Sequence, residues 1–147
     1  MAIDIVHVDK DGLGLFSEVA EDVFDEEIDL DRLAKYLREK SHIMVIALHE
    51  NVIVGQVLAV IHLHPDKGTE LYLDDLGVSP SFQRQGIATS MLRVLFSVAK
   101  QRGCAEFWVA TEPDNTQGNE FYKSLNLRMK TAFVFEGEFG NLSDSET

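Results

Sequence analysis

The sequence predicts a mixed α/β domain with an antiparallel first half and a parallel crossover in the middle. Two adjacent β-rich runs at 42–64 are broken at Glu50-Asn51. A third run at 70–78 leads through a short polar turn into an amphipathic helix, and another apolar run follows that helix. The 147 residues, 45% of them hydrophobic, suffice for one core. We expect one domain over residues 1–136 and a disordered tail over 137–147.

The first half should contain a strand, two helices and two further strands. Apolar and polar residues alternate in "IDIVHV", which indicates a short strand, and residues 14–24 look helical. The segment 26–40 has acidic residues at its start and basic residues at its end, as an amphipathic helix does. The Glu50-Asn51 break then predicts a hairpin.

The second half should alternate strands and helices. Residues 70–78 form a strand closed by Ser79-Pro80, and apolar residues recur at helical spacing from Ala88 to Ala99. Gly103 should end that helix, and "AEFWVA" should be a buried strand with Trp108 in the core. The segments "GNEFYKSL" and "RMKTAFVFEGE" are then expected to form a short helix and a last strand.

Composition excludes several classes of protein. The single cysteine, Cys104, rules out an internal disulfide and a cysteine-rich zinc site. His62 and His64 share a strand face without an obvious third ligand, so we expect no metal. No apolar stretch reaches the roughly 20 residues of a membrane span. The N-terminus lacks a basic region and a cleavage site, so we expect a cytoplasmic protein without a membrane partner.

Charge is concentrated in the first half of the chain. Residues 1–75 carry 17 acidic and 6 basic residues, whereas residues 76–147 carry 8 and 7, and the net charge is −12. Such a surface repels polyanions, so nucleic acid is not an expected partner. It attracts cationic small molecules, although acidic residues that only keep a protein soluble give the same balance.

The stretch "QRQGIA", from Gln83 to Ala88, lies where a strand exit meets a helix start. Backbone N–H groups at a helix start lack partners and carry partial positive charge, so this turn is suited to a pyrophosphate. Gly86 would let a phosphate approach closely. The alternative is an ordinary helix cap in which glycine serves only the turn.

A second polar segment follows the next strand. In "NTQGNEFYKSLNL", the Asn115 amide is suited to bonding a peptide-like group, and Tyr122 offers a phenol that can give up a proton. The alternative is that Asn115 caps a helix and Tyr122 is partly core.

Together these segments resemble the GNAT superfamily of acyl-CoA-dependent N-acetyltransferases. "LGVSP" with "QRQGIA" is similar to the family's strand exit and pyrophosphate loop, and Asn115-x-x-Gly118-x-x-x-Tyr122 is similar to its Asn-x-x-Ala-x-x-x-Tyr segment. The resemblance runs from about Ile3 to Phe135 and implies a GNAT fold with six to seven strands and four helices. Two residues depart from the pattern: Gly118 replaces alanine, and Asn126 replaces glycine at a helix end, where asparagine is tolerated.

The resemblance implies acetyl-CoA as co-substrate and direct transfer to an amine. Asp75, which aligns with the acidic residue before "L-x-V", is the preferred proton acceptor, and Asp74 is the other candidate. Only one of the two should face the cleft, because successive strand residues alternate. Tyr122 is the candidate acid for the departing sulfur. A backbone N–H near Val78 should polarise the carbonyl. The expected coenzyme-binding residues are Leu76, Val78, Gln83, Arg84, Gln85, Gly86, Ile87, Ala88, Thr89 and Asn115.

A narrower likeness concerns the substrate. "ELYLDDLGVSPSFQRQGIATSML" looks like the branch of aminoglycoside 3-N-acetyltransferases of the fortimicin and gentamicin type, which act on polycationic amines. The expected acceptor is therefore an aminoglycoside-like or polyamine substrate. Acetylation of a protein or peptide amine, and a non-catalytic acyl-CoA sensor, stay open. So does a homodimer, because dimers are frequent among proteins that resemble this one.

Overall fold

The computed structural model describes residues 2–140. Residues 1 and 141–147 lie outside the described residues, and so does most of the tail expected to be disordered. The fold divides into two units, Met1–Ala110 and Thr111–Thr147. Each unit is described by itself below, and the single domain over 1–136 stays a prediction.

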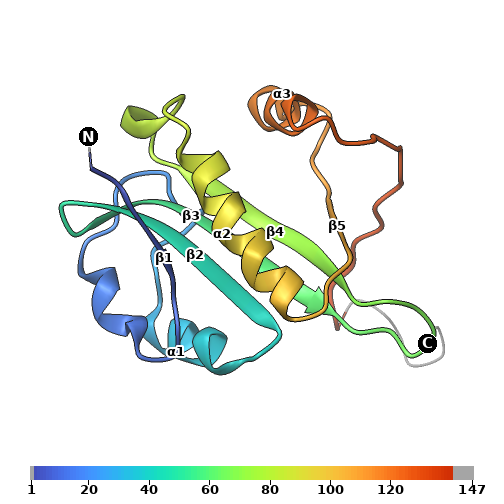
Figure 1. The fold of residues 1–147 in the computed structure, drawn as a ribbon, viewed down its shortest axis with the longest axis horizontal. Coiled ribbons are helices and arrows are strands. Elements are labelled where there is room, and N and C mark those ends of the chain that lie inside the picture. Colours follow the sequence, from blue (N-terminus) through green and yellow to red (C-terminus); the bar gives the residue numbers. More distant parts are fainter. Residues whose placement is uncertain (1, 141–147) are drawn as a thin grey trace. The chain divides into compact units, whose positions relative to one another are not determined.

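The first unit contains a five-stranded mixed sheet (Figure 1). The spatial order is β1-β2-β3-β4-β5, with antiparallel pairs up to β4 and a parallel pair between β4 and β5. Glu50 and Asn51 have φ of 50° and 66°, the pair of positive values that a tight hairpin turn needs, so the β2–β3 hairpin is confirmed. The strands are β1 Asp4–His7, β2 His42–His49, β3 Val52–His62, β4 Glu70–Val78 and β5 Glu106–Val109.

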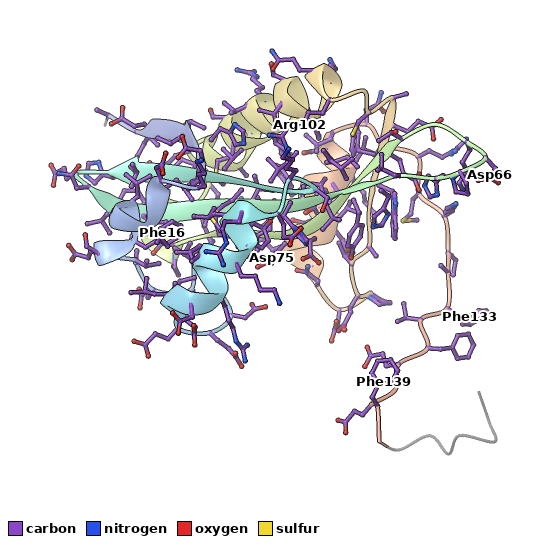
Figure 2. The ribbon with its side chains drawn as sticks, turned by 90° about the horizontal axis from the view of Figure 1, so that it is seen from below. Phe16, Asp66, Asp75, Arg102, Phe133 and Phe139 are labelled. Atoms are coloured by element: carbon purple, nitrogen blue, oxygen red, sulfur yellow. The ribbon has the colours of Figure 1, made fainter. Side chains whose placement is uncertain are left out.

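Helices cover both faces of this sheet (Figure 2). α2, Ile87–Gln101, packs its apolar stripe on one face, where Met91 and Leu95 are fully buried. The other face carries the 3-10 helix η1, Gly12–Ser17, and α1, Leu30–Arg38, which bury Phe16 and Leu33 against Met44, Ile46 and Ile53. Asp29 caps α1 by accepting from Arg32 N–H at 3.0 Å. A second 3-10 helix, η2, spans Pro80–Phe82.

The helix expected over residues 14–24 is wrong in its extent. Only η1 is helical, and Glu18 is already extended at φ −141° and ψ 123°. The backbone of residues 18–20 bonds to β3 instead: Ile53 N–H donates to Glu18 O, and Ala20 N–H donates to Ile53 O. These hydrogen bonds to β3 hold residues 18–20 in an extended conformation, and the local sequence pattern does not predict them.

The prediction for β5 is right in position and wrong in burial. β5 is an edge strand, so its residues alternate between two unlike faces. Phe107 packs against Phe96 of α2 with ring centroids 4.5 Å apart, whereas Trp108 is 45% exposed and lies against Tyr72, at 4.4 Å. Trp108 is therefore not a core residue.

The second unit contains α3, Thr116–Ser124. Asn119 ties the preceding loop to the helix by donating to Glu112 O at 3.1 Å. Asn126 has a φ of 61°, as expected for its helix-end position. Residues 128–138, all of them described, form no strand, so the expected last strand is wrong and the sheet has five strands. Alternation alone does not supply a partner strand, and Phe133 and Phe135 are 88% and 94% exposed.

Candidate active site

Strand β4 carries both aspartates at a β-bulge. Leu58 pairs with Asp75 and Ala59 pairs with Leu73, so Asp74 is the extra residue. The bulge interrupts the alternation that would send the two side chains to opposite faces. Asp74 is exposed, whereas Asp75 is half-buried on the face that carries α1 (Figure 2).

Two hydrogen bonds hold the Asp75 carboxylate. Leu76 N–H donates to Oδ1, and the Gln56 side-chain amide donates to Oδ2, both at 3.0 Å. The same Gln56 Nε2 donates to Val23 O at 3.0 Å, which ties the segment between η1 and α1 to the site. A Cβ at Gly77 would collide with Val23 O, so the absence of a side chain there lets that segment lie on β4.

The environment raises the pKa of Asp75 above its ordinary value. Burial is the largest cause, and the charges of Asp25 and Asp74 add to it, while the hydrogen bonds from Gln56 and Leu76 oppose it. The pKa of the Tyr36 phenol on α1 is also raised, first by burial and then by Asp74. Asp75 is therefore a stronger base than an exposed carboxylate, as proton abstraction requires.

Among the described residues, no strand pairs with the second edge of β4 beside these aspartates. β5 ends at Val109, opposite Leu73, but β4 continues to Val78. Ser79 N–H donates to Val54 O at 2.9 Å on the β3 side. Because backbone polar groups alternate along a strand, those of Leu76 and Val78 point to the side where β5 has ended, and of these the Leu76 N–H bonds to the Asp75 carboxylate. An extended amide chain can add to such an edge.

The turn after β4 leads into α2 without a side-chain cap. Gly86 is the N-cap at φ 80°, and no acidic residue occupies the first turn. Ser90 N–H donates to Gly86 O at 3.0 Å, so the preceding amides of residues 87–89 have no acceptor within the helix. A Cβ at Gly86 would meet nothing within 4 Å, so the required backbone conformation, not crowding inside the protein, explains this glycine.

The other turn residues that we expected to bind the coenzyme differ in their hydrogen bonds and in their burial. Gln83 Nε2 reaches back to Val78 O at 3.0 Å, and Gln85 Nε2 donates to Ser81 O at 3.4 Å. Arg84 is exposed at φ 60°. Ile87 is buried, and Ala88 and Thr89 are half-buried.

The second unit places Asn115 and Tyr122 on α3. Asn115 Oδ1 accepts from Gly118 N–H at 3.1 Å, so its side chain serves as the helix cap. A Cβ at Gly118 would collide with the Asn115 side chain, which explains glycine where the family pattern has alanine. Tyr122 is half-buried beside Phe121, with ring centroids 5.3 Å apart.

Two features of the site went unnoticed in the sequence. One is Gln56, which the pattern places in an apolar strand. The other is a cavity of about 430 Å³ between η1 and α1, with Phe16 and Phe24 among its walls and three acidic residues, Asp25, Glu26 and Glu27, beside them. The acidic run was a signal for the cavity, but only the fold shows that Asp25 acts on Asp75.

The histidines and the cysteine lie away from this chemistry. His64 Nε2 lies 2.9 Å from Glu70 Oε1, and His62 stacks on Tyr72. No group of three or more metal-ligating side chains gathers anywhere in residues 2–140. Burial raises the pKa of the Cys104 thiol, so it is not an activated nucleophile. None of the described helices is long and apolar enough to cross a membrane.

The mixed sheet, whose fourth strand runs into a helix start without a side-chain cap, agrees with the GNAT fold expected from the sequence. The sequence profile described as "Acetyltransferase (GNAT) family" matches residues 12–126, and the chain belongs to this family. A thialysine N-ε-acetyltransferase from Sus scrofa is 34% identical over 77 residues, covering 48% of this chain and 45% of that protein. The match thus spans about half the length of such relatives.

Two further comparisons cover nearly the whole chain. Aminoglycoside N(6')-acetyltransferase type 1 from Acinetobacter haemolyticus is 27% identical over 130 residues, covering 86% of this chain and 88% of that protein. A structure of AAC(6')-Iy in complex with the bisubstrate analogue CoA-S-monomethyl-acetylneamine superposes with a TM-score of 0.77 at 21% identity, covering 94% and 99% of the two chains. The latter likeness establishes the GNAT fold.

Proposed function

We propose that this protein transfers the acetyl group of acetyl-CoA to a primary amine of a cationic small molecule. The proposal rests on the order of three features along one short segment of the chain. Asp75 with its raised pKa, the outward backbone groups of Leu76 and Val78, and the uncapped start of α2 follow one another within 15 residues of chain. A base, an extended binding edge and an anion site are the three parts that an amine and an acyl-CoA require.

The residues of the first unit fit the coenzyme in two places. The diphosphate accepts from the amides of residues 85–89, which are free of side-chain caps and surround an open Gly86. The pantetheine N–H groups donate to the outward backbone carbonyl groups of Leu76 and Val78, which leaves the Val78 N–H for the thioester. Arg84 adds positive charge, and Gln83 shapes the turn through its bond to Val78 O. Asn115, which caps α3, is proposed to form a hydrogen bond near the pantetheine arm.

Asp75 begins the chemistry by removing a proton from the substrate ammonium group, directly or through one water. The neutral amine attacks the thioester carbonyl, and the N–H of Val78 stabilises the developing oxyanion. The C–S bond breaks as the C–N bond forms, the nitrogen loses its second proton to water, and the CoA thiolate leaves. Asp74, the exposed neighbour, holds positive charge on the acceptor. Acetyl-CoA supplies the activated acyl group, and no covalent enzyme intermediate is needed.

Tyr122 protonates the departing thiolate in this proposal. Its role comes from the resemblance to GNAT enzymes, in which a tyrosine on the helix after the fifth strand holds this position. We expect Tyr122→Phe to lower the turnover number about a hundredfold or more while changing the coenzyme Kd by less than about twofold, since a side chain used for proton transfer contributes at least that much to rate. A thiol-release assay measures the turnover number, and calorimetry measures the coenzyme Kd. An unchanged turnover number would show that Tyr122 is not the acid.

The acidic first half supports a cationic acceptor. Asp25, Glu26 and Glu27 beside the apolar walls of the cavity suit a molecule with an ammonium group and a ring or methylene chain. A relative that acetylates aminoglycosides at N(6') and a thialysine acetyltransferase support an amine acceptor of this kind. They do not favour the 3-N position over the 6' position, so aminoglycoside-like and polyamine acceptors are proposed without a regiochemistry.

The alternatives are a protein or peptide N-acetyltransferase and a non-catalytic acyl-CoA sensor. A panel of amines with acetyl-CoA, read as released thiol, separates them. We expect spermidine and kanamycin-like amines to turn over faster than uncharged peptide amines. Activity on peptides alone would reverse this order, and coenzyme binding with no thiol release from any amine would favour the sensor. Asp75→Asn is the matched control, which should bind coenzyme normally and release little thiol.

A further inference from the structure

Gln56 is a buried polar residue in the middle of β3. Its side chain is 0% exposed, and among the described residues only Ser79 is another buried polar side chain. Burying an amide costs free energy unless its polar atoms are paired. An apolar residue of similar size, such as leucine or methionine, would fill the same space without that cost.

The two N–H groups of the Gln56 amide are both used. Nε2 donates to Val23 O and to Asp75 Oδ2, each at 3.0 Å. The Val23 carbonyl and the ionised Asp75 carboxylate accept only, so the amide cannot be turned around without setting its own oxygen against theirs. Oε1 is left buried without a hydrogen-bond partner among the described residues. The protein therefore tolerates one unpaired acceptor in order to keep both donors where they are.

These bonds join two parts of the site that the chain separates widely. Val23 belongs to the segment that lines the cavity side through Phe24 and Asp25, and Asp75 belongs to β4. The Asp75 carboxylate is fixed at both oxygens, by Gln56 on one side and Leu76 N–H on the other. Gly77 lets Val23 lie directly against β4, so a small rotation of either part would break the bridge.

We propose that Gln56 is a positioning residue for the transfer reaction, holding the Asp75 carboxylate and the acceptor-side segment at Val23 in one fixed arrangement. It touches neither the amine nor the coenzyme. It sets where the proton acceptor lies and limits its rotation, which controls how often an amine meets the base in a productive geometry. This inference rests on the proposed function of Asp75.

The charges around Asp75 give the inference a distinct signature. Asp25 from the cavity segment and Asp74 from β4 face it and raise its pKa, and Tyr36 of α1 lies within the field of Asp74. The Gln56 hydrogen bond acts in the opposite direction. Removing the donor therefore raises the pKa of Asp75 further, and the protonated, inactive form of the base persists to higher pH.

The test variant is Gln56→Met, which conserves volume and removes both donors. Ile46→Met is the matched control, because Ile46 lies opposite Gln56 on β2, is equally buried and takes no part in the hydrogen-bonded bridge. We expect Gln56→Met to shift the acid limb of the kcat/KM profile upward by about one pH unit, the effect of losing one hydrogen bond to a charged group. Turnover number should fall, and the coenzyme Kd should stay within about twofold of the wild type.

A second readout does not depend on activity. Carboxyl-labelled aspartate, with Asp75→Asn to assign the signal, reports the titration of Asp75 by NMR in the wild type and in Gln56→Met. An upward shift in the variant supports the inference even if no amine is acetylated, which would overturn only the proposed function. An unshifted titration, or an activity loss with an unchanged pH profile, overturns the inference.

Gln56→Glu covers the case in which the methionine variant does not fold. It has the size of glutamine but can donate at most one hydrogen bond, and when ionised it places a second carboxylate beside Asp75. We expect the same upward shift of the acid limb. A profile equal to that of the wild type would contradict the bridge.

Discussion

At the scale of single residues, the site depends on groups placed where their surroundings change their chemistry. Asp75 has a raised pKa because it is half-buried and faces Asp25 and Asp74. Gly86 adopts φ 80°, which places the amides of the turn at the helix start. Neither effect follows from residue type alone. An aspartate on an exposed strand edge would keep an ordinary pKa, and a glycine in a flexible loop would not hold the amides in place.

The raised pKa of Asp75 predicts a pH dependence with a definite sign. The base must be ionised to accept a proton, so kcat/KM should fall as pH drops through the raised pKa, above the ordinary range for aspartate of about 4. Asp25→Asn removes one charge that raises this pKa, so it should move the acid limb to lower pH. Asp31→Asn, on the exposed first turn of α1, is the control that should leave the limb in place. A limb that does not move in Asp25→Asn contradicts the electrostatic account.

The conformation of Gly86 predicts that the turn tolerates some substitutions better than others. A β-branched residue pays about 1–2 kcal/mol to hold a left-handed conformation, which corresponds to roughly a tenfold loss of acetyl-CoA affinity in Gly86→Val if the bound turn keeps this shape. Gly86→Asn should lose less than about threefold, because asparagine tolerates that region. Calorimetry with acetyl-CoA measures both, and equal losses would mean that bulk, not conformation, matters.

At the scale of elements, strand β4 and the start of α2 form most of the proposed coenzyme site. The bulge at Asp74, the strand's extension beyond β5 and the absence of a cap at Gly86 combine to give the continuous edge that we propose binds the coenzyme. The spacing of apolar residues was enough to predict β4 and α2, because periodicity follows directly from which face is buried. It was not enough to predict the bulge, which depends on how β4 pairs with β3.

Helix α3 gives a test of a cap against helix propensity. Glycine to alanine in a helix interior ordinarily gains about 1 kcal/mol. Here the new Cβ would displace the Asn115 side chain and remove its bond to residue 118, so Gly118→Ala should gain nothing or lose protection of the α3 amides. In an Asn115→Ala background the same change should increase protection. Hydrogen exchange of the α3 amides measures the protection in both variants. Increased protection in Gly118→Ala alone would contradict the role of Asn115 as the helix cap.

At the scale of the whole molecule, charge sets which partners approach. The acidic first half predicts that a polycationic acceptor is attracted over a distance comparable with the Debye length. Raising the salt concentration from about 0.02 M to 0.5 M should therefore increase KM for spermidine several-fold, because screening weakens that attraction. KM for a small monoamine should change much less. Equal salt effects on both would assign the acidic residues to solubility only.

The sequence predicted the order of elements up to α3 but missed what tertiary contacts decide. The hairpin at Glu50-Asn51 and the helix end at Gly103 were foreseen because both need positive φ values that few residues adopt. Backbone pairing with Ile53 shortened the first helix, and the apolar segment at 128–138 lacks the partner that would make it a strand. Gln56 could not be identified from a pattern that treats its strand as apolar.

The central claim is that main-chain amides at the start of α2 bind the coenzyme diphosphate while Asp75 lies beside the thioester. A crystal structure of the protein with CoA tests it most directly. The account predicts diphosphate oxygens within hydrogen-bond distance of amides in the segment 85–89, and the pantetheine arm along Leu76 and Val78. A diphosphate bound elsewhere, with that turn making no contact with it, would contradict the account.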